Sequence, residues 1–256
     1  DDIEYDIHTN KLEIGINSLL NEDENQRLAG GIRTFYAEAE LSTSSDITTG
    51  SIDSKSYGLG ASLTFYNASE FFIDGQLQYA IFDSDIESEG TTLVEGNDGR
   101  GFAASIEVGQ RFSIKDDLSF TPELQLMYYR ADFDRFTSET GETVDLKNGT
   151  TSEMRLGGTW EYWLDGDHEE DNRVYLSTNL FRRFDRETSV TVDESPLDYQ
   201  SRPWRGELGL GLSRQWTNRR GMQASIYGEL GVGTEFGSRF RDGRKARATF
   251  GVKVEF

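Results

Sequence analysis

Few residues in this sequence have the types and spacing that common catalytic mechanisms need. Histidine occurs only as His8 and His168, and cysteine is absent. No serine stands in the Gly-x-Ser-x-Gly turn that presents a hydrolase nucleophile, and no local pattern joins either histidine to a serine and an acid. We therefore predict two solvent-exposed histidines and no catalytic residue. The lack of cysteine excludes disulfides and thiolate metal sites.

The densest group of possible metal ligands is the run Asp165 to Asp171, which reads DGDHEED. It lacks the ligand spacing of an EF-hand calcium loop. We predict a solvated acidic turn there, and we expect neither a metal nor a cofactor. The acidic segment from Asp83 to Glu95 leaves open a looser alternative, in which loops hold divalent cations at a lipopolysaccharide surface.

Composition restricts the class of protein without deciding it. The 256 residues carry a formal net charge of -20, and the mean hydropathy is -0.62. So acidic a chain does not bind nucleic acid by neutralising phosphates. No stretch approaches the ~18–20 consecutive apolar residues of a membrane-spanning helix, and no signal segment opens the chain. These values fit a soluble protein, but they also fit a membrane β-barrel, in which only alternate residues face lipid.

The pattern along the chain distinguishes these two possibilities. Eleven segments alternate apolar and polar residues with a period of two, at residues 5–20, 27–42, 55–67, 71–86, 99–114, 118–135, 151–165, 173–189, 203–217, 222–236 and 246–256. In one of them Tyr57, Leu59, Ala61, Leu63 and Phe65 share a face, because successive side chains of a strand point to opposite sides. Several segments exceed ten residues, a length that suits tilted membrane strands. The sequence therefore predicts one all-β domain over residues 1–256.

The connections between these segments alternate in length. Those at 43–54, 87–98, 136–150, 190–202 and 237–245 are long and polar, whereas those at 21–26, 68–70, 115–117, 166–172 and 218–221 are mostly short. Outer-membrane barrels have short periplasmic turns and longer outer loops. Trp and Tyr near the strand ends also suit the aromatic girdles of such barrels. Both features favour an antiparallel transmembrane β-barrel over a soluble one.

The last segment ends on a free aromatic residue. Phe250, Val252, Val254 and Phe256 recur at every second position. This pattern is the one expected of a final barrel strand that the outer-membrane assembly machinery recognises. We predict that these four residues form the assembly signal.

The polar faces of the segments predict the residues that line the lumen. The acidic candidates are Glu13, Glu38, Glu40, Asp74, Glu107, Glu123, Glu161, Glu207, Glu229 and Glu255, and the basic candidates are Lys11, Arg111, Arg155, Arg205, Arg247 and Lys253. A porin for sugar acids would carry mainly Arg and Lys, so the mixed signs weaken that alternative. A mixed wall suits a channel that holds a peptide segment. Alternatively, the charges pair across strands and only brace the wall.

Four stretches resemble the autotransporter (type V secretion) β-domain, in the order in which that family carries them. They are Tyr57 to Ile81 (YGLGASLTFYNASEFFIDGQLQYAI), Gly101 to Met127 (GFAASIEVGQRFSIKDDLSFTPELQLM), Glu207 to Trp216 (ELGLGLSRQW) and Tyr227 to Val232 (YGELGV). The resemblance implies a barrel of twelve strands. Because the opening segment Tyr5 to Leu20, which includes KLEIGINSLL, resembles the family's second strand, the first strand and the helical linker are expected to be absent here.

The resemblance also implies a function and a set of partners. The domain would anchor a passenger domain in the outer membrane of a Gram-negative bacterium and help to export it, without enzymatic activity or a cofactor. Expected partners are the lipid bilayer, lipopolysaccharide, the protein's own passenger and linker, and the barrel-assembly machinery, and a monomer is expected. Three alternatives stay open: a passive small-solute porin, an outer-membrane barrel hydrolase, and a soluble β protein.

Overall fold

A computed structural model describes residues 4–44, 49–138, 141–147, 149–164, 172–185, 187–193, 195–217, 223–237 and 244–255 of the chain. All regular elements in these ranges are strands. None of the described residues forms a helix long and apolar enough to cross a membrane.

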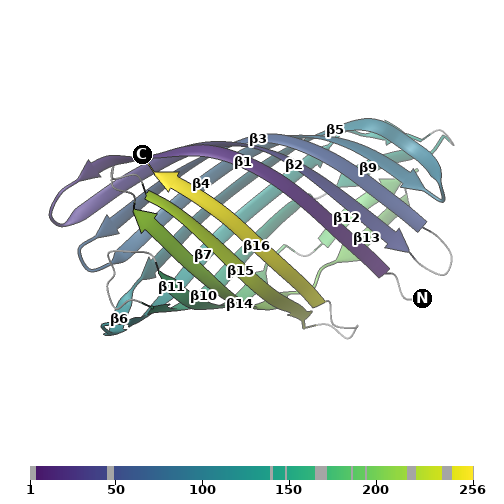
Figure 1. The fold of residues 1–256 in the computed structure, drawn as a ribbon. Helices are drawn as coiled ribbons and strands as arrows, with labels where there is room; N and C mark the ends of the chain where they lie inside the picture. The colour runs from purple at the N-terminus through teal and green to yellow at the C-terminus, as the bar shows by residue number, and fades with distance from the viewer. Residues whose placement is uncertain are drawn as a thin grey trace.

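Eleven long strands follow one another in chain order around one curved antiparallel sheet (Figure 1). They are β1 (Glu4–Glu22), β2 (Gln26–Ser44), β3 (Thr49–Asn67), β4 (Phe71–Ser88), β5 (Thr91–Gln110), β7 (Leu118–Phe133), β10 (Thr150–Trp163), β11 (Arg173–Arg183), β14 (Trp204–Thr217), β15 (Gln223–Phe236) and β16 (Arg244–Glu255). The short β6 (Phe112–Lys115) pairs with β7. Each strand of the eleven corresponds to one predicted segment, so the predicted antiparallel all-β fold is confirmed.

β1 and β16 stand at the two ends of this order. Among the residues that the structure describes, each has a strand partner on one side only. The sheet curves like a barrel wall (Figure 1), but no described pairing closes it.

Two of the predicted long loops are mostly strand. The pairing of β2 with β3 continues to Ser44 opposite Thr49, so little of 43–54 is a loop. The pairing of β4 with β5 reaches Ser88 opposite Thr91, and the turn between them contains Glu89 and Gly90 with positive φ. The Ser-, Thr- and Asp-rich composition indicated loops, but a ladder of backbone hydrogen bonds does not need an apolar face outside lipid.

The connections predicted at 136–150 and 190–202 form a second sheet. It contains β8 (Phe136–Thr137), β9 (Thr143–Lys147), β12 (Glu187–Val192) and β13 (Ser195–Gln200), in the order β13-β12-β9-β8. Its central pairing joins β9 to β12, more than forty residues apart, with Val144 opposite Val192. Figure 1 shows this sheet at the end of the barrel where β1 begins.

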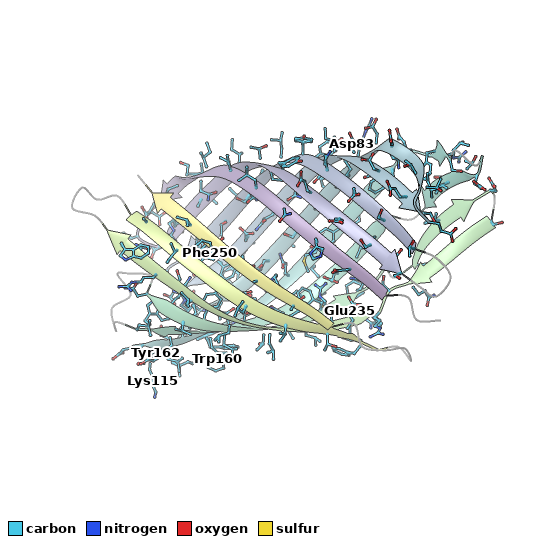
Figure 2. All side chains as sticks on the ribbon, turned by 45° about the vertical axis from the view of Figure 1, so that its right-hand side comes forward. Asp83, Lys115, Trp160, Tyr162, Glu235 and Phe250 are labelled. Carbon is cyan, nitrogen blue, oxygen red and sulfur yellow. The ribbon has the colours of Figure 1, made fainter. Side chains whose placement is uncertain are left out.

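The distribution of apolar side chains is inverted relative to that of a soluble domain. The buried apolar residues of the described chain are Phe35, Ala80, Trp163 and Phe181, whereas forty large apolar residues are exposed. Most of the exposed ones lie on the outer face, as Trp160, Tyr162 and Phe250 do in Figure 2. An exposed apolar surface of this extent marks contact with a partner or a membrane. On a closed or nearly closed β-wall, it is the band that faces lipid.

Glycines on the opposite, inner face make room for aromatic rings. A Cβ at Gly58 would overlap the ring of Phe35, and a Cβ at Gly211 would overlap that of Tyr175. Phe72 lies in the same way against Gly109. These glycines therefore leave the space that an aromatic ring from the neighbouring strand occupies.

Candidate functional site

The candidate site is the inner wall, which we define as the face of the eleven-stranded sheet opposite the apolar outer band. The predicted lumen residues that lie at its positions and have described side chains are Lys11, Glu13, Asp74, Glu107, Arg111, Glu123, Arg155, Glu161, Arg205, Glu207, Glu229 and Arg247. The side chains of Lys253 and Glu255 lie outside the described residues, although their backbone belongs to β16. A role for these residues in lining a channel stays a prediction.

Arg155 on β10 is the centre of the wall. Its guanidinium lies 2.9 Å from Glu107 Oε2 and 3.0 Å from Glu123 Oε2, and it donates to Gln125 Oε1 at 3.0 Å. It also donates to Asn179 Oδ1 at 2.8 Å. The planar guanidinium group of Arg155 thus joins strands β5, β7, β10 and β11. Arginine can do this because it has several N–H donors in a fixed geometry.

A second set of contacts extends toward β1. Asp74 accepts hydrogen bonds from Thr64 Oγ1 at 2.6 Å and from Gln76 Nε2 at 2.8 Å. Gln76 in turn accepts one from Arg33 Nη2 at 3.2 Å. Arg33 Nε lies 3.5 Å from Glu13 Oε2, so polar contacts continue across β1 to β4.

Glu161 anchors the end of the wall at the short turns. Its carboxylate lies 2.7 Å from Arg173 Nη1 and 3.1 Å from Arg111 Nη2, and Ser119 Oγ donates to it at 3.3 Å. Both guanidinium groups also lie over the ring of Trp163, which is only 4% exposed. A cavity of about 570 Å³ opens beside this group and is bounded by the turn between β1 and β2.

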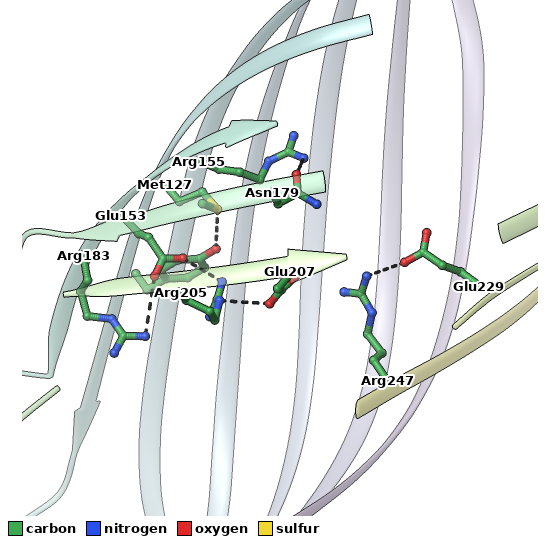
Figure 3. A network of polar contacts seen from close by, with 10 residues as sticks. Met127, Glu153, Arg155, Asn179, Arg183, Arg205, Glu207, Glu229 and Arg247 are labelled. Carbon is green, nitrogen blue, oxygen red and sulfur yellow. Dashed lines mark hydrogen bonds and ion pairs between the residues drawn. The ribbon is translucent and has the colours of Figure 1, made fainter. Parts of the chain in front are cut away.

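Glu153 holds the same wall together near the opposite end of β10. It lies 3.2 Å from Arg205 Nη2 and 3.6 Å from Arg183 Nη2 (Figure 3). Arg205 also lies 3.0 Å from Glu207 and stacks 3.9 Å above the centre of the Phe181 ring. Further along, Arg247 Nη2 lies 2.6 Å from Glu229 Oε1 (Figure 3).

Glu38 and Glu40 were predicted to face the lumen, and the register places them on the outer face instead. Glu38 is opposite Lys55 and Glu40 is opposite His8, on the same side as Leu12. Tyr36 on that side donates to Glu38 Oε1. The prediction assumed that the polar side of β2 faces the lumen along the whole strand. At Glu38 and Glu40, however, β2 extends beyond the apolar outer band, and there its outward side chains are polar.

Several wall residues were missed by the sequence prediction: Arg33, Glu153, Arg173, Tyr175, Asn179 and Arg183. Strict counting of alternate positions from Arg155 and Glu161 would have found Glu153. Counting alternate positions along the predicted segment 173–189 would have found the missed residues of β11, which are Arg173, Tyr175, Asn179 and Arg183. Which side chains these residues contact could not be predicted from the sequence, because the contacts depend on the register between strands.

The remaining predicted residues have no arrangement for catalysis or metal binding in the described part of the chain. His8 lies 3.1 Å from Asp6, and both side chains are 72% exposed. His168 and the run Asp165–Asp171 lie outside the described residues. No group of three or more His, Cys, Asp or Glu side chains among the described residues has an arrangement that fits a metal ion. The segment Asp83–Glu95 is largely strand.

The described part of the predicted assembly signal lies on the lipid-facing side of β16. Phe250 is 74% exposed and Val252 is 62% exposed. The side chain of Val254 and the whole of Phe256 fall outside the described residues. Recognition by an assembly machine therefore stays a prediction.

An apolar outer band around a polar, ion-paired inner wall defines a transmembrane β-barrel. The family model "Autotransporter beta-domain" matches residues 1–226. The chain is 32% identical over 258 residues to the "Adhesin BmaC autotransporter" of Brucella suis biovar 1 (strain 1330). It belongs to the autotransporter β-domain family, and it is an outer-membrane translocator barrel that serves passenger export.

Other relatives agree with this assignment. The "Autotransporter adhesin/invasin TibA" of Escherichia coli O78:H11 (strain H10407 / ETEC) is 25% identical over 189 residues, or 72% of this chain. The match to the Brucella protein covers 98% of this chain but only 7% of that protein. The match to TibA covers 19% of TibA.

Two solved structures share the fold. The transport unit of the autotransporter AIDA-I from Escherichia coli has a TM-score of 0.83 at 17% identity, covering 99% of this chain and 84% of that one. The β-domain of the Bordetella autotransporter BrkA has a TM-score of 0.67 at 20% identity, covering 96% and 91%.

Proposed function

We propose that the inner wall surrounds the linker that joins the barrel to its passenger. The observation that carries this proposal is the polar, cross-braced wall inside an apolar band. Arg155 and Glu161 each bind several partners on other strands, so the wall keeps its shape while its remaining lone pairs and donors offer modest hydrogen bonds to a peptide. The barrel itself contributes no catalytic step.

Planar-bilayer conductance tests this role against the porin alternative. We expect a barrel joined to its upstream segment to conduct poorly, and a barrel freed of that segment to conduct well, because a peptide in the lumen displaces ions. Equal, large conductance from both forms would favour a porin. Esterase and lipase assays with a serine-directed inhibitor test the hydrolase alternative, and we expect no inhibitor-sensitive activity.

We also propose that one further antiparallel strand completes the barrel. β1 and β16 each have one side without a described strand partner, and as the first and last of eleven successive antiparallel strands they run in the same direction. A single strand antiparallel to both satisfies these two edges and produces an even number of strands. Cysteines placed on β1 or β16 and on the upstream segment of the full-length protein would then form disulfides in the assembled barrel.

Assembly, surroundings and passenger type complete the proposal. The alternating Phe250 and Val252 support recognition of β16 by the barrel-assembly machinery. The acidic outer ends of the strands suit contact with lipopolysaccharide through bridging cations.

We propose a monomer with an adhesin-type passenger, following the names of the relatives. Loss of host-cell attachment on deletion of the passenger, with the barrel still assembled, tests the last point.

A further inference from the structure

The two faces of strands β1 to β4 exchange their character beyond the membrane band. Within the band the outer face carries Leu12, Ile14 and Leu59, which are 64%, 67% and 67% exposed. Toward the start of β1 the outer face becomes a charged row, in which the register aligns His8, Glu40, Asp53 and Asp85. This part of the wall therefore stands in water, outside the lipid.

At the same height, the inner face carries an apolar row. The register aligns Ile7, Leu41, Ile52, Ile86 and Val94 across β1 to β5. Ile7 is 56% exposed, and the other four are half-buried. Aligned neighbours on one face contact one another across the strands, so these side chains form one continuous strip.

The next row toward the membrane carries short, mostly polar side chains. Thr9, Ala39, Ser54, Ser84 and Asn97 align there, with Ser54 Oγ 2.9 Å from Ser84 Oγ. Ser84 and Asn97 are buried, so this row separates the apolar strip from the polar wall below it. We call the strip of Ile7, Leu41, Ile52, Ile86 and Val94 the ledge, which lies on the inside of the barrel mouth.

We propose that this ledge binds the barrel-proximal segment of the exported passenger, as extended chain with apolar residues at alternate positions. The inference rests on the proposed function, because a passenger must lie in the mouth for the ledge to meet it. Apolar surface turned toward a water-filled mouth is stabilised when it is covered. The passenger is the polypeptide that this family moves through the mouth.

The position of the ledge favours this occupant over others. The ledge lies on the inner face and includes Ile7, three residues after Glu4 at the start of β1, so a polypeptide that leaves through the mouth lies next to it. The outer row of Glu40, Asp53 and Asp85 is acidic, so a second copy would meet like charges on the outside of this wall.

Site-specific photocrosslinking in the full-length protein tests the proposal. A benzophenone amino acid at Ile52, on the ledge, should crosslink to the passenger near the barrel, whereas the same probe at the neighbouring Asp53, on the outer face, should not. In the double variant Leu41→Ser/Ile52→Ser, the passenger molecules that reach the cell surface should have a barrel-proximal segment about tenfold more sensitive to added protease than in the unaltered protein, because that segment loses local protection.

Other outcomes overturn the inference. They are no adduct at Ile52 while the passenger reaches the surface, equal adducts at Ile52 and Asp53, or adducts at Ile52 to a second barrel or to the hairpin of β12 and β13. If the double variant fails to assemble, the crosslinks in the otherwise unaltered protein still decide. A passenger that stays inside the cell in the unaltered protein would instead contradict the proposed function.

Discussion

Individual guanidinium and carboxylate groups hold the inner wall together by bridging strands. Arg155 contacts side chains from three neighbouring strands, and Glu161 binds two guanidinium groups. Paired charges on a wall facing water are less costly than in a dry core, but removing one partner leaves the others without their counter-charge. The most enclosed carboxylates should therefore matter most.

The variant Glu161→Gln should destabilise the barrel by about 1–3 kcal/mol, because Arg111 and Arg173 lose the charge that both bind. Arg130→Gln is the matched control. It breaks an exposed pair, with Arg130 Nε 2.8 Å from Asp132 Oδ2, and should change stability by less than about 0.5 kcal/mol. Heat-dependent gel mobility and circular dichroism in detergent measure both effects. Equal losses in the two variants would contradict the bracing role of Glu161.

Gly211 should tolerate no side chain. In Gly211→Ala the new methyl group would collide with the Tyr175 ring, which should cost about 1–3 kcal/mol. Gly228→Ala is the control, because its Cβ would find only the Thr249 carbonyl oxygen, at 3.9 Å. Adding Tyr175→Ala to Gly211→Ala should recover part of the lost stability. Failure of that double variant to recover any stability would show that the ring is not the cause.

Asp23 should give the turn between β1 and β2 a dependence on pH. Its carboxylate accepts hydrogen bonds from the backbone N–H of Asn25 at 2.9 Å and of Gln26 at 3.0 Å. The hydrogen bond from Asn25, and then that from the Gln26 side chain, hold the pKa of Asp23 below its ordinary value. The stabilisation is therefore present above the unfolded pKa and is lost as pH falls through the lower, folded pKa. NMR titration of Asp23 checks this, with Asp23→Asn as the non-titrating control, and a raised midpoint would contradict it.

The strands serve two different environments along their length. β14, β15 and β16 have 12 to 14 residues, whereas β1 to β5 have 18 to 20. A tilted membrane strand needs only ~9–11 residues. The longer strands therefore extend past the lipid, where the outer face no longer has to be apolar, and the small sheet of β8, β9, β12 and β13 lies at the same end (Figure 1).

Leu210 tests the lipid-facing band. It is opposite Leu230 on β15, and both are well exposed on the outer face. Leu210→Arg should destabilise the barrel by about 2–4 kcal/mol, because arginine at the membrane midplane is costly. Glu40→Arg, on the outer face beyond the band, should have little effect. Refolding into lipid vesicles measures the difference, and a similar cost at both positions would contradict the placement of the band.

At the level of the whole molecule, the edges of β1 and β16 that have no strand partner among the described residues are the weak point of the sheet. Unpaired strand edges invite pairing with other chains. They also leave backbone groups without partners where no water is present.

We expect the barrel of residues 1–256 alone to unfold at a lower temperature, and to associate more readily, than the same barrel joined to its upstream segment. Heat-dependent gel mobility and light scattering in detergent compare the two forms. An upstream segment of scrambled sequence is the control for added length. Equal melting of all three forms would contradict closure by a further strand.

Much of the fold was predictable because period-two alternation is local. All eleven barrel segments were predicted from the sequence, and each corresponds to one long strand, although 99–114 also includes most of β6 and 173–189 also includes the start of β12. The small second sheet was missed because β9 pairs with β12 across a long sequence separation. Glu38 and Glu40 were misplaced because Ala37, Ala39 and Leu41 continue an apolar alternation after the membrane band has ended, which reverses the meaning of the polar side.

The sequence by itself determined the all-β class, the set of barrel strands and the apolar face that meets lipid, since each depends only on the order of neighbouring residues. The tertiary structure alone decided which charges pair. Arg155 meets Glu107 and Glu123 because register and curvature bring β5, β7 and β10 together at that height. It also revealed where the two faces exchange character, because that depends on how far each strand extends beyond its neighbours and beyond the lipid.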